Sequence, residues 1–140
     1  MLSQTAEYAL RSIIYLSRTP YDPLTIQVIA EATEIPSGYL SKVMQQLRKA
    51  GLLNSTRGKK GGFVLKRPPS EITLFEVVDA VTPFADLSVC PLTNPENCTN
   101  NLFKGHLSPL CPLHTILNSL NENLAGQFKK ITLESLLPKS

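Results

Sequence analysis

The sequence predicts a mainly α-helical fold with a small β-hairpin wing, namely a winged helix-turn-helix followed by a long C-terminal dimerisation helix. Three observations predict this fold. Several segments carry apolar residues at helical spacing. A short turn separates two of these segments in the first third of the chain, and two strand-like runs then flank a basic, Gly-rich tip. With 42% hydrophobic and 18% charged residues, the 140-residue chain can bury a core.

The first helix is expected over residues 5–17, with Ser3 or Thr5 as its cap. One apolar stripe at helical spacing predicts it. The stripe comprises Ala6, Ala9, Leu10, Ile13 and Ile14. Glu7 and Arg11 interrupt this apolar run and no basic residue precedes it, so a cleaved signal peptide is not expected.

A second, shorter helix is expected over residues 26–32. Thr25 stands where an N-cap belongs, and Val28 and Ile29 are expected to face the core. A turn over residues 33–36 follows, because Pro36 restricts the backbone of the residue before it.

The third helix is expected over residues 38–50, with Ser37 as its N-cap and Gly51 just beyond its end. Its buried face is predicted to consist of Leu40, Val43, Met44 and Leu47. Two helices joined by so short a turn form a helix-turn-helix. Strand-like runs at residues 52–56 and 62–65 then enclose the Gly-rich tip of a hairpin.

The C-terminal half carries two further helix signals. Thr73 and Glu76 form a capping box ahead of a short helix that runs to Val81. A long helix is expected over residues 109–130, with an apolar stripe that the small body of the chain cannot cover entirely. This stripe comprises Leu113, Ile116, Leu117, Leu120, Leu124 and Phe128. A symmetry-related copy of the same helix is its simplest cover.

These elements divide the chain into three segments. Residues 1–68 form the winged helix-turn-helix, residues 69–108 the connecting helix and a cysteine-bearing loop, and residues 109–140 the dimerisation helix and tail. No apolar run is long enough to cross a membrane. Together with the lack of a recognisable export signal, this predicts a cytoplasmic chain. In that compartment three cysteines are expected to be free, metal-binding or redox-active thiols rather than disulfides.

The charge is distributed unevenly along the chain. No acidic residue occurs from Ile35 through Ser70, a stretch of 36 residues that holds eight of the fourteen basic residues. The remainder of the chain carries a net charge of −5. A basic lobe on an acidic body is typical of a face that binds nucleic acid, and here it coincides with the predicted helix-turn-helix and hairpin.

We therefore predict contacts with double-stranded DNA from both elements. The start of the third helix offers short polar side chains to base edges in the major groove. The hairpin tip offers cations to a narrow minor groove. The predicted contact residues are Ser37, Gly38, Tyr39, Ser41, Lys42, Gln45, Arg57, Lys59 and Lys60.

The cysteines Cys90, Cys98 and Cys111 follow a C-x7-C-x12-C pattern. This spacing matches no common zinc, thioredoxin or ferredoxin motif, so the thiols could bind a metal, undergo redox chemistry or pack in the core. Cys111 begins the predicted long helix, where a helix N-terminus favours the thiolate form. His106 and His114 lie nearby as further potential ligands, but we favour a loop residue for His106 and a helix-surface residue for His114.

An enzyme is not expected. Cys111 and His114 are spaced i, i+3 and could be neighbours on a helix. A nucleophilic cysteine needs an orienting group as well, and no phosphate-binding Gly-rich loop, catalytic carboxylate pair or nucleophile elbow accompanies them. No small-molecule substrate is therefore expected.

The chain resembles the Rrf2 family of winged-helix regulators, of the IscR/NsrR type. Three stretches carry the resemblance over essentially the whole chain, and the segment from Leu47 to Gly62 is the most specific. They read YALRSIIYL, IPSGYLSKVMQQLRKAGLLNSTRGKKGGFVL and ITLFEVVDAV. The resemblance implies a homodimeric transcription factor that binds an inverted-repeat operator, with Arg57 as the minor-groove arginine. Ser41 stands where some members carry an acidic, base-discriminating residue, so the operator sequence does not carry over.

The resemblance also implies an iron–sulfur cluster, either 2Fe-2S or 4Fe-4S. Sensor members of the family hold it with three cysteines, here matched by Cys90, Cys98 and Cys111, and some add a carboxylate from the first helix of the partner, matched by Glu7. The gap of twelve residues before Cys111 is longer than the family's usual spacing. The resulting hypothesis is a sensor of redox state, nitric oxide or iron–sulfur supply. The alternative keeps the same DNA-binding fold without a cluster, controlled by thiol oxidation, a small molecule or a partner protein.

Overall fold

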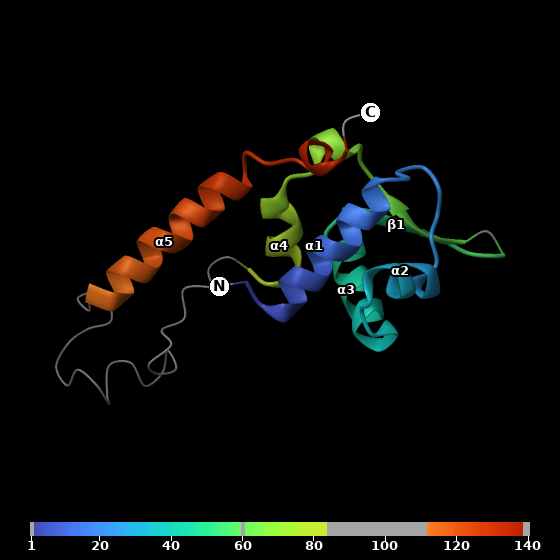
Figure 1. The fold of residues 1–140 in the computed structure, drawn as a ribbon, viewed down its shortest axis with the longest axis horizontal. Coiled ribbons are helices and arrows are strands. Elements are labelled where there is room, and N and C mark those ends of the chain that lie inside the picture. Colours follow the sequence, from blue (N-terminus) through green and yellow to red (C-terminus); the bar gives the residue numbers. More distant parts are fainter. Residues whose placement is uncertain (1, 60, 84–111, 139–140) are drawn as a thin grey trace.

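The computed structural model describes residues 2–59, 61–83 and 112–138, with side chains from residue 115 onward in the last range. Helices dominate it, and one two-stranded antiparallel sheet is present (Figure 1). The elements, in chain order, are α1 (Gln4–Ser17), α2 (Ile26–Thr33), α3 (Ser37–Lys49), β1 (Leu53–Thr56), β2 (Gly62–Leu65), η1 (Pro69–Glu71), α4 (Leu74–Val81), α5 (Pro112–Phe128) and η4 (Glu134–Leu136). Within the described ranges, no helix has the length and apolar character needed to cross a membrane.

The helix-turn-helix forms where the sequence predicts it, with two local corrections. Thr25 caps α2 through its side chain, which accepts a hydrogen bond from the Val28 backbone N–H. Val28 itself is 42% exposed and does not face the core, because Ile29 and Thr33 take the buried positions on this short helix. Ser37 is not the N-cap of α3: the helix begins at Ser37, and Pro36, which has no capping side chain, takes the cap position.

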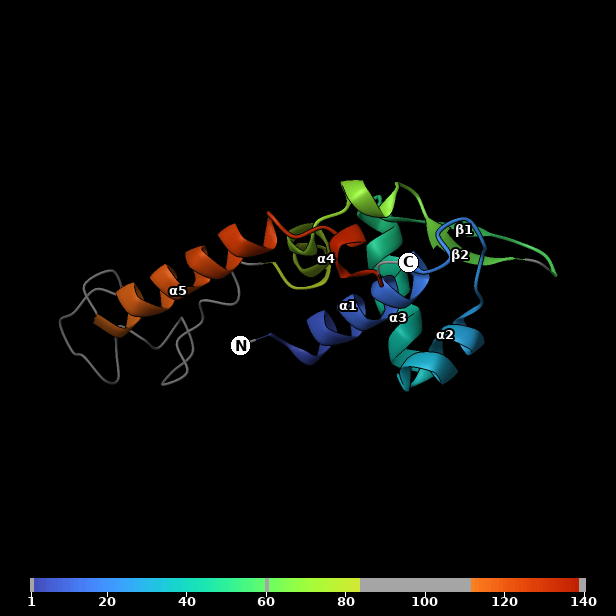
Figure 2. The same cartoon turned by 45° about the horizontal axis from the view of Figure 1, so that its top comes forward.

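The core lies where α1, α3 and α4 meet, and α1 is its central element (Figures 1 and 2). Ser3 caps α1 by accepting the Ala6 N–H at 3.1 Å. The fully buried apolar side chains on α1 and α3 recur every third or fourth residue, which is the helical spacing that predicted them. They are Ala6, Ala9, Ile13, Leu16, Leu40, Met44 and Leu47.

The hairpin pairs β1 with β2 in antiparallel register, from Leu53 opposite Leu65 to Thr56 opposite Gly62. Its base is buried through Leu53, Phe63 and Leu65, whereas its tip projects beyond the helices. Gly51, with φ +83°, ends the preceding helix and turns the chain into β1. In both views the hairpin and α5 extend from opposite sides of the helical body (Figures 1 and 2).

The capping box at the start of α4 is present. The Thr73 side chain accepts the Glu76 N–H, and the Glu76 carboxylate accepts the Thr73 N–H at 3.0 Å. Arg67 donates to the same carboxylate at 2.8 Å and so ties the segment after the hairpin to α4. Burial raises the pKa of Glu76, but the hydrogen bonds from Thr73 and Arg67 and the charge of Arg67 outweigh it and leave this pKa below its ordinary value.

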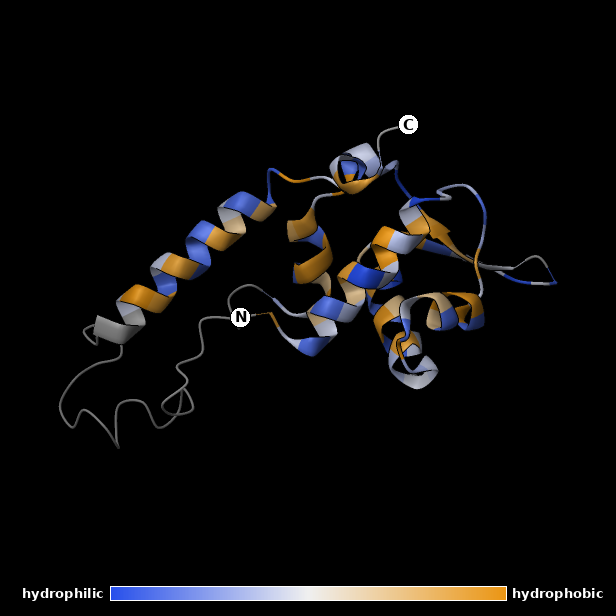
Figure 3. Cartoon of the chain, viewed as in Figure 1, coloured by the Kyte–Doolittle hydropathy of each residue, from blue (hydrophilic) through white to orange (hydrophobic). Residues whose placement is uncertain are grey.

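Among the described residues, the long helix α5 packs on the apolar core through the C-terminal half of the helix. Leu124 and Phe128 pack against the buried Ala6 and Val78. Further toward its N-terminus, Ile116 is 55% and Leu120 48% exposed, and Figure 3 shows apolar residues recurring along this projecting part. The expected first residues of this helix, 109–111, lie outside the described residues, as does the side chain of Leu113.

After α5 the chain returns to the core. The Leu74 N–H donates to the Ile131 carbonyl, and the Leu133 N–H donates to the Ile72 carbonyl, both at 2.9 Å. The Leu133 side chain is fully buried in the same cluster as α1 and α3. The core therefore draws on residues from all three of the segments that the sequence suggests.

Candidate nucleic-acid interface

The helix α3 has one buried and one exposed face. Leu40, Val43, Met44 and Leu47 point into the core. The predicted DNA-contact residues lie on the rest of its circumference. Ser37, Gly38, Tyr39, Lys42 and Gln45 are exposed, and Ser41 is half-buried. The core contacts of α3 thus orient its polar face toward solvent along the whole length of the helix.

Gln45 is already engaged on this surface. Its side-chain oxygen accepts a hydrogen bond from Arg48 Nε at 2.9 Å. A bidentate contact of Gln45 with adenine requires both the oxygen and the amide nitrogen of the carboxamide. The bond from Arg48 uses one of the two lone pairs of this oxygen, so the second lone pair and the amide nitrogen are what Gln45 can offer to a base.

A groove of about 610 Å³ runs along one flank of α3. Its lining includes predicted contact residues, but also Thr5 from α1 and Val81 from α4. The full set is Thr5, Tyr39, Ser41, Lys42, Val43, Gln45, Gln46, Lys49 and Val81. Sequence reasoning missed Thr5 and Val81 because their place beside α3 depends on how α1 and α4 pack, which no local pattern reveals.

The hairpin tip presents Arg57 and Lys59, both exposed. Gly58 adopts φ +105° and its carbonyl accepts the Gly61 N–H at 2.9 Å, which closes the tip. A side chain at Gly61 would collide with the Thr56 and Gly58 carbonyl oxygens. Lys60 lies outside the described residues.

Most cations of the acid-free stretch face solvent in the structure. Arg67 is the exception, because it is half-buried and paired with Glu76. The other described cations of the stretch are exposed, namely Lys42, Arg48, Lys49, Arg57, Lys59 and Lys66. The stretch therefore folds into two neighbouring basic projections, α3 and the hairpin, on one lobe.

Of the four candidate cluster ligands, the structure describes Glu7 alone. This carboxylate stands exposed in the first turn of α1, where the Glu7 backbone N–H donates to the Ser3 carbonyl at 3.0 Å. Cys90, Cys98 and Cys111 lie outside the described residues, as do His106 and the side chain of His114. Among the residues that are described, no three His, Cys, Asp or Glu side chains group as a metal site would require.

Comparisons with known proteins match nearly the whole chain. The model of the Rrf2 family, described as an iron-dependent transcriptional regulator, matches residues 2–139. A helix-turn-helix-type transcriptional regulator of Aquifex aeolicus is 28% identical over 137 residues, which cover 98% of this chain and 91% of the relative.

Solved structures share the fold at low sequence identity. The global cysteine regulator CymR of B. subtilis has a TM-score of 0.72 at 22% identity, covering 97% of this chain and 95% of that one. The oxidized form of Staphylococcus aureus CymR has a TM-score of 0.73 at 21% identity, covering 100% and 98%. IscR of T. potens has a TM-score of 0.70 at 19% identity, covering 100% and 93%.

The expected fold is confirmed by these neighbours and by the observed helices and hairpin. Because both CymR and IscR are among the neighbours, the likeness does not single out the IscR/NsrR type that the sequence suggests. The family model spans all the described elements, from the first residue of α1 to the last of η4. The protein therefore belongs to the Rrf2 family of transcriptional regulators.

Proposed function

We propose that the protein regulates transcription by binding, as a homodimer, to an inverted-repeat operator in double-stranded DNA. One observation carries this proposal. The longest acid-free stretch of the sequence, from Ile35 through Ser70, contains α3 and the hairpin, and six of its cations are exposed. Cations without acidic neighbours attract phosphates and release their counterions, which is the main source of affinity for DNA.

The two projections suit the two grooves. The helix α3 is wide enough to fill a major groove, and its N-terminal half would bring Ser37, Gly38, Tyr39, Ser41, Lys42 and Gln45 to base edges and nearby phosphates. The hairpin would bring Arg57, with Lys59 and Lys60, to the adjacent minor groove, where a narrow A·T tract concentrates negative potential. Phosphate contacts by Lys42 and Lys49 would set the register.

The second copy of the chain is proposed to pack on α5. Ile116 and Leu120 expose apolar surface there, beyond the part of α5 that the body covers. Rrf2 regulators bind DNA, typically as dimers. A two-fold axis through paired α5 helices would present two copies of α3 to two half-sites of opposite orientation.

The signal is proposed to reach the protein through an iron–sulfur cluster, 2Fe-2S or 4Fe-4S, bound by Cys90, Cys98 and Cys111 with Glu7 of the partner subunit as the fourth ligand. Three thiolates and one carboxylate fit such a cluster chemically, because cysteine is its usual ligand and a carboxylate is a more labile one. The exposed position of Glu7 is consistent with a ligand offered to a second chain. When bound, the cluster would supply a group that oxidation, nitric oxide or iron shortage can alter.

Thiol chemistry without a cluster is the second candidate. The same three cysteines could oxidise, and the fold matches a CymR structure solved in its oxidized form. Anaerobic purification followed by visible spectroscopy and iron and sulfide analysis separates the two. A brown protein with iron and sulfide supports the cluster, whereas a colourless, iron-free protein whose DNA binding responds to thiol oxidants supports the thiols.

The DNA-binding proposal is tested by salt-dependent binding to a fluorescein-labelled duplex that the protein selects from a random pool. Affinity should fall linearly on logarithmic axes as salt rises. Lys42→Ala should weaken binding and reduce the slope by about 0.9 per half-site, the value for one phosphate contact. Lys130→Ala, which removes an exposed cation just beyond the end of α5, is the charge-matched control. Affinity that is independent of salt would contradict the proposal.

A further inference from the structure

Tyr39 of α3 is in contact with an aromatic side chain of α1. The rings of Tyr8 and Tyr39 meet edge to face, with centroids 6.2 Å apart and an interplanar angle of 67°. Tyr39 is 58% exposed, whereas Tyr8 is half-buried and packs against the core. The exposed Tyr39 ring therefore packs against the Tyr8 ring, whose position is fixed by the core.

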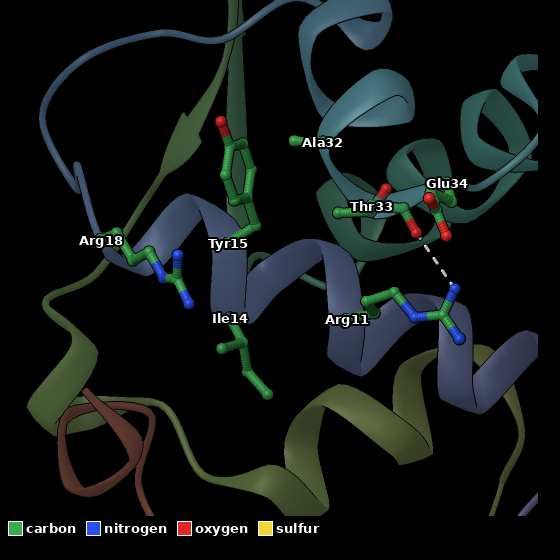
Figure 4. A pocket seen from close by; sticks show the side chains of 7 residues that line it. All are labelled: Arg11, Ile14, Tyr15, Arg18, Ala32, Thr33 and Glu34. Atoms are coloured by element: carbon green, nitrogen blue, oxygen red, sulfur yellow. Dashed lines mark hydrogen bonds between the residues drawn. The ribbon is translucent and has the colours of Figure 1, made fainter. Parts of the chain in front are cut away.

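Tyr8 is itself held by side chains of α1. Gln4 Nε2 donates a hydrogen bond to the Tyr8 hydroxyl at 3.0 Å, and the Arg11 guanidinium lies 5.6 Å from the centre of the Tyr8 ring. Arg11 also donates from Nη1 to the Thr33 carbonyl at 3.1 Å, as Figure 4 shows. Thr33 is the last residue of α2.

These contacts span the turn of the helix-turn-helix. Arg11 is bonded to the end of α2 before the turn, and Tyr8 touches the first turn of α3 after it. The turn itself offers α3 little support, because Pro36 occupies its N-cap without a side-chain hydrogen bond. A helix start without a capping side chain lacks a stabilising contact that Ser, Thr or Asp would supply. The contact of Tyr8 with Tyr39 then adds to the burial of Leu40 in holding the first turn of α3 in place.

We propose that Tyr8 is a positioning residue for DNA recognition, which rests on the proposed function above. Together with Arg11, it fixes the orientation of Tyr39 and of the first turn of α3 relative to α2. Tyr8 does not touch DNA in this role. It acts through Tyr39, whose ring it keeps beside the groove that Lys42 and Gln46 line.

A double-mutant cycle distinguishes the proposed positioning role of Tyr8 from a purely structural role. Tyr8→Leu keeps apolar bulk at the site and removes the aromatic contact. We expect it to lower the affinity for the selected duplex roughly two- to tenfold, the range for one aromatic pair. In a Tyr39→Leu background, Tyr8→Leu should change affinity no further, because the two residues act as a unit. Tyr8→Phe, which keeps the ring, should restore most of the affinity.

Tyr15 provides the matched control. It is also a half-buried tyrosine of α1 that packs against the core. However, it lines the pocket between α1 and α2 (Figure 4) and lies about two helical turns further along α1 than Tyr8. Tyr15→Leu should lower the melting temperature about as much as Tyr8→Leu and leave the DNA affinity unchanged. Equal losses of affinity in both variants would overturn the proposal.

The position of Tyr39 can also be read without DNA. In protein isotopically labelled at its tyrosine rings, the NMR signals of the Tyr39 ring should shift in the Tyr8→Leu variant, because a neighbouring ring alters the local magnetic field. The same signals should stay in place in the Tyr15→Leu variant. If the chain binds DNA, unchanged Tyr39 signals in the Tyr8→Leu variant, or additive affinity losses from Tyr8→Leu and Tyr39→Leu, would overturn the proposed role of Tyr8 and leave the proposed function standing. Failure of the wild-type chain to select any duplex would overturn the proposed function and this role with it.

Discussion

Phe63 and Leu24 are joined by two backbone hydrogen bonds. The Phe63 N–H donates to the Leu24 carbonyl at 2.8 Å, and the Leu24 N–H donates to the Phe63 carbonyl at 3.0 Å. Leu24 directly precedes Thr25, the cap of α2, so the base of the hairpin is fixed to the helix-turn-helix. The position of Arg57 relative to α3 therefore depends on this bridge.

Gly62→Ala should break the bridge. Gly62 adopts φ +148°, and a Cβ there would collide with the Leu24 carbonyl and the Thr25 nitrogen. We expect a loss of about 1–3 kcal/mol in the free energy of unfolding, the range for backbone strain at one residue, measured by urea denaturation. Gly126→Ala is the control: its Cβ meets open space within α5, and removing glycine from a helix should stabilise the protein by about 0.5–1 kcal/mol. Equal stability of the two variants would show that Gly62 is not needed for the bridge.

Arg57→Ala should weaken binding to the selected duplex by about 1–3 kcal/mol, because it removes a side chain proposed to enter the minor groove. The loss should be largest on duplexes with an A·T tract at the groove that the hairpin reaches. Competition titrations at fixed salt measure it. Lys66→Ala, an exposed cation just beyond β2, should cost less. Undiminished affinity of the Arg57 variant would contradict the minor-groove role.

Glu7→Ala should shorten the lifetime of the cluster without unfolding the chain, because the Glu7 side chain is exposed and the proposed ligand is lost. Anaerobic visible spectra followed over time after exposure to air, together with melting temperatures, provide the measurement. Glu31→Ala removes an equally exposed acid from α2 and should leave the spectrum and its decay unchanged. An identical decay in both variants would remove Glu7 from the ligand set.

Leu120→Glu should convert the proposed dimer to monomer, because it places a charge in the apolar surface of α5 next to Ile116. Sedimentation velocity over a range of concentrations measures the change. The monomeric variant should bind DNA far more weakly, since only one half-site is then contacted at a time. Ser119→Glu introduces the same charge at an exposed neighbouring position off this apolar surface and should leave the dimer intact. A dimeric Leu120 variant would contradict pairing through this part of α5.

Glu76 predicts a small pH dependence of stability. Its pKa is lower in the folded chain than its ordinary value, so the folded state favours the ionised carboxylate. The stabilisation is then fully present above the ordinary carboxyl pKa of about 4.3 and is lost as the pH falls through the lower pKa of the folded state. Because the Glu76 side chain is 37% exposed, solvent screening keeps the effect small. Glu76→Gln should flatten the acid limb of a plot of stability against pH, and an unchanged limb would exclude this carboxylate as a contributor.

Local patterns predicted the elements whose formation depends on neighbouring residues. Thr73 and Glu76 form the expected capping box, and Gly51 ends α3 with a positive φ, because both features need only a few consecutive residues. Val28 was assigned to the core wrongly because a helix of eight residues offers too few positions to define its buried face. The expected Ser37 cap was wrong because Pro36, already extended, can start the helix one residue earlier.

Features that depend on packing between distant segments were not predicted. The groove beside α3 needs Thr5 and Val81, which come from opposite ends of the described N-terminal region. The contact of Tyr8 with Tyr39 joins residues on different helices, and both residues look like ordinary surface aromatics in the sequence. The burial of Leu133 was missed because a single apolar residue after a helix carries no periodic signal.

The complete burial of Leu133 has a consequence for how the chain folds during synthesis. The N-terminal residues leave the ribosome first, yet the core that contains α1 and α3 closes only when Leu133 and its backbone bonds to Ile72 are in place. While residue 133 is still inside the exit tunnel, the nascent winged helix-turn-helix lacks a core residue and two backbone hydrogen bonds that hold α4. Final consolidation of this core is therefore expected only once residue 133 has left the tunnel, by which time α5, which precedes it in the chain, is outside as well. A nascent chain that stops short of residue 133 would therefore present α3 and the hairpin on a core that is not yet closed.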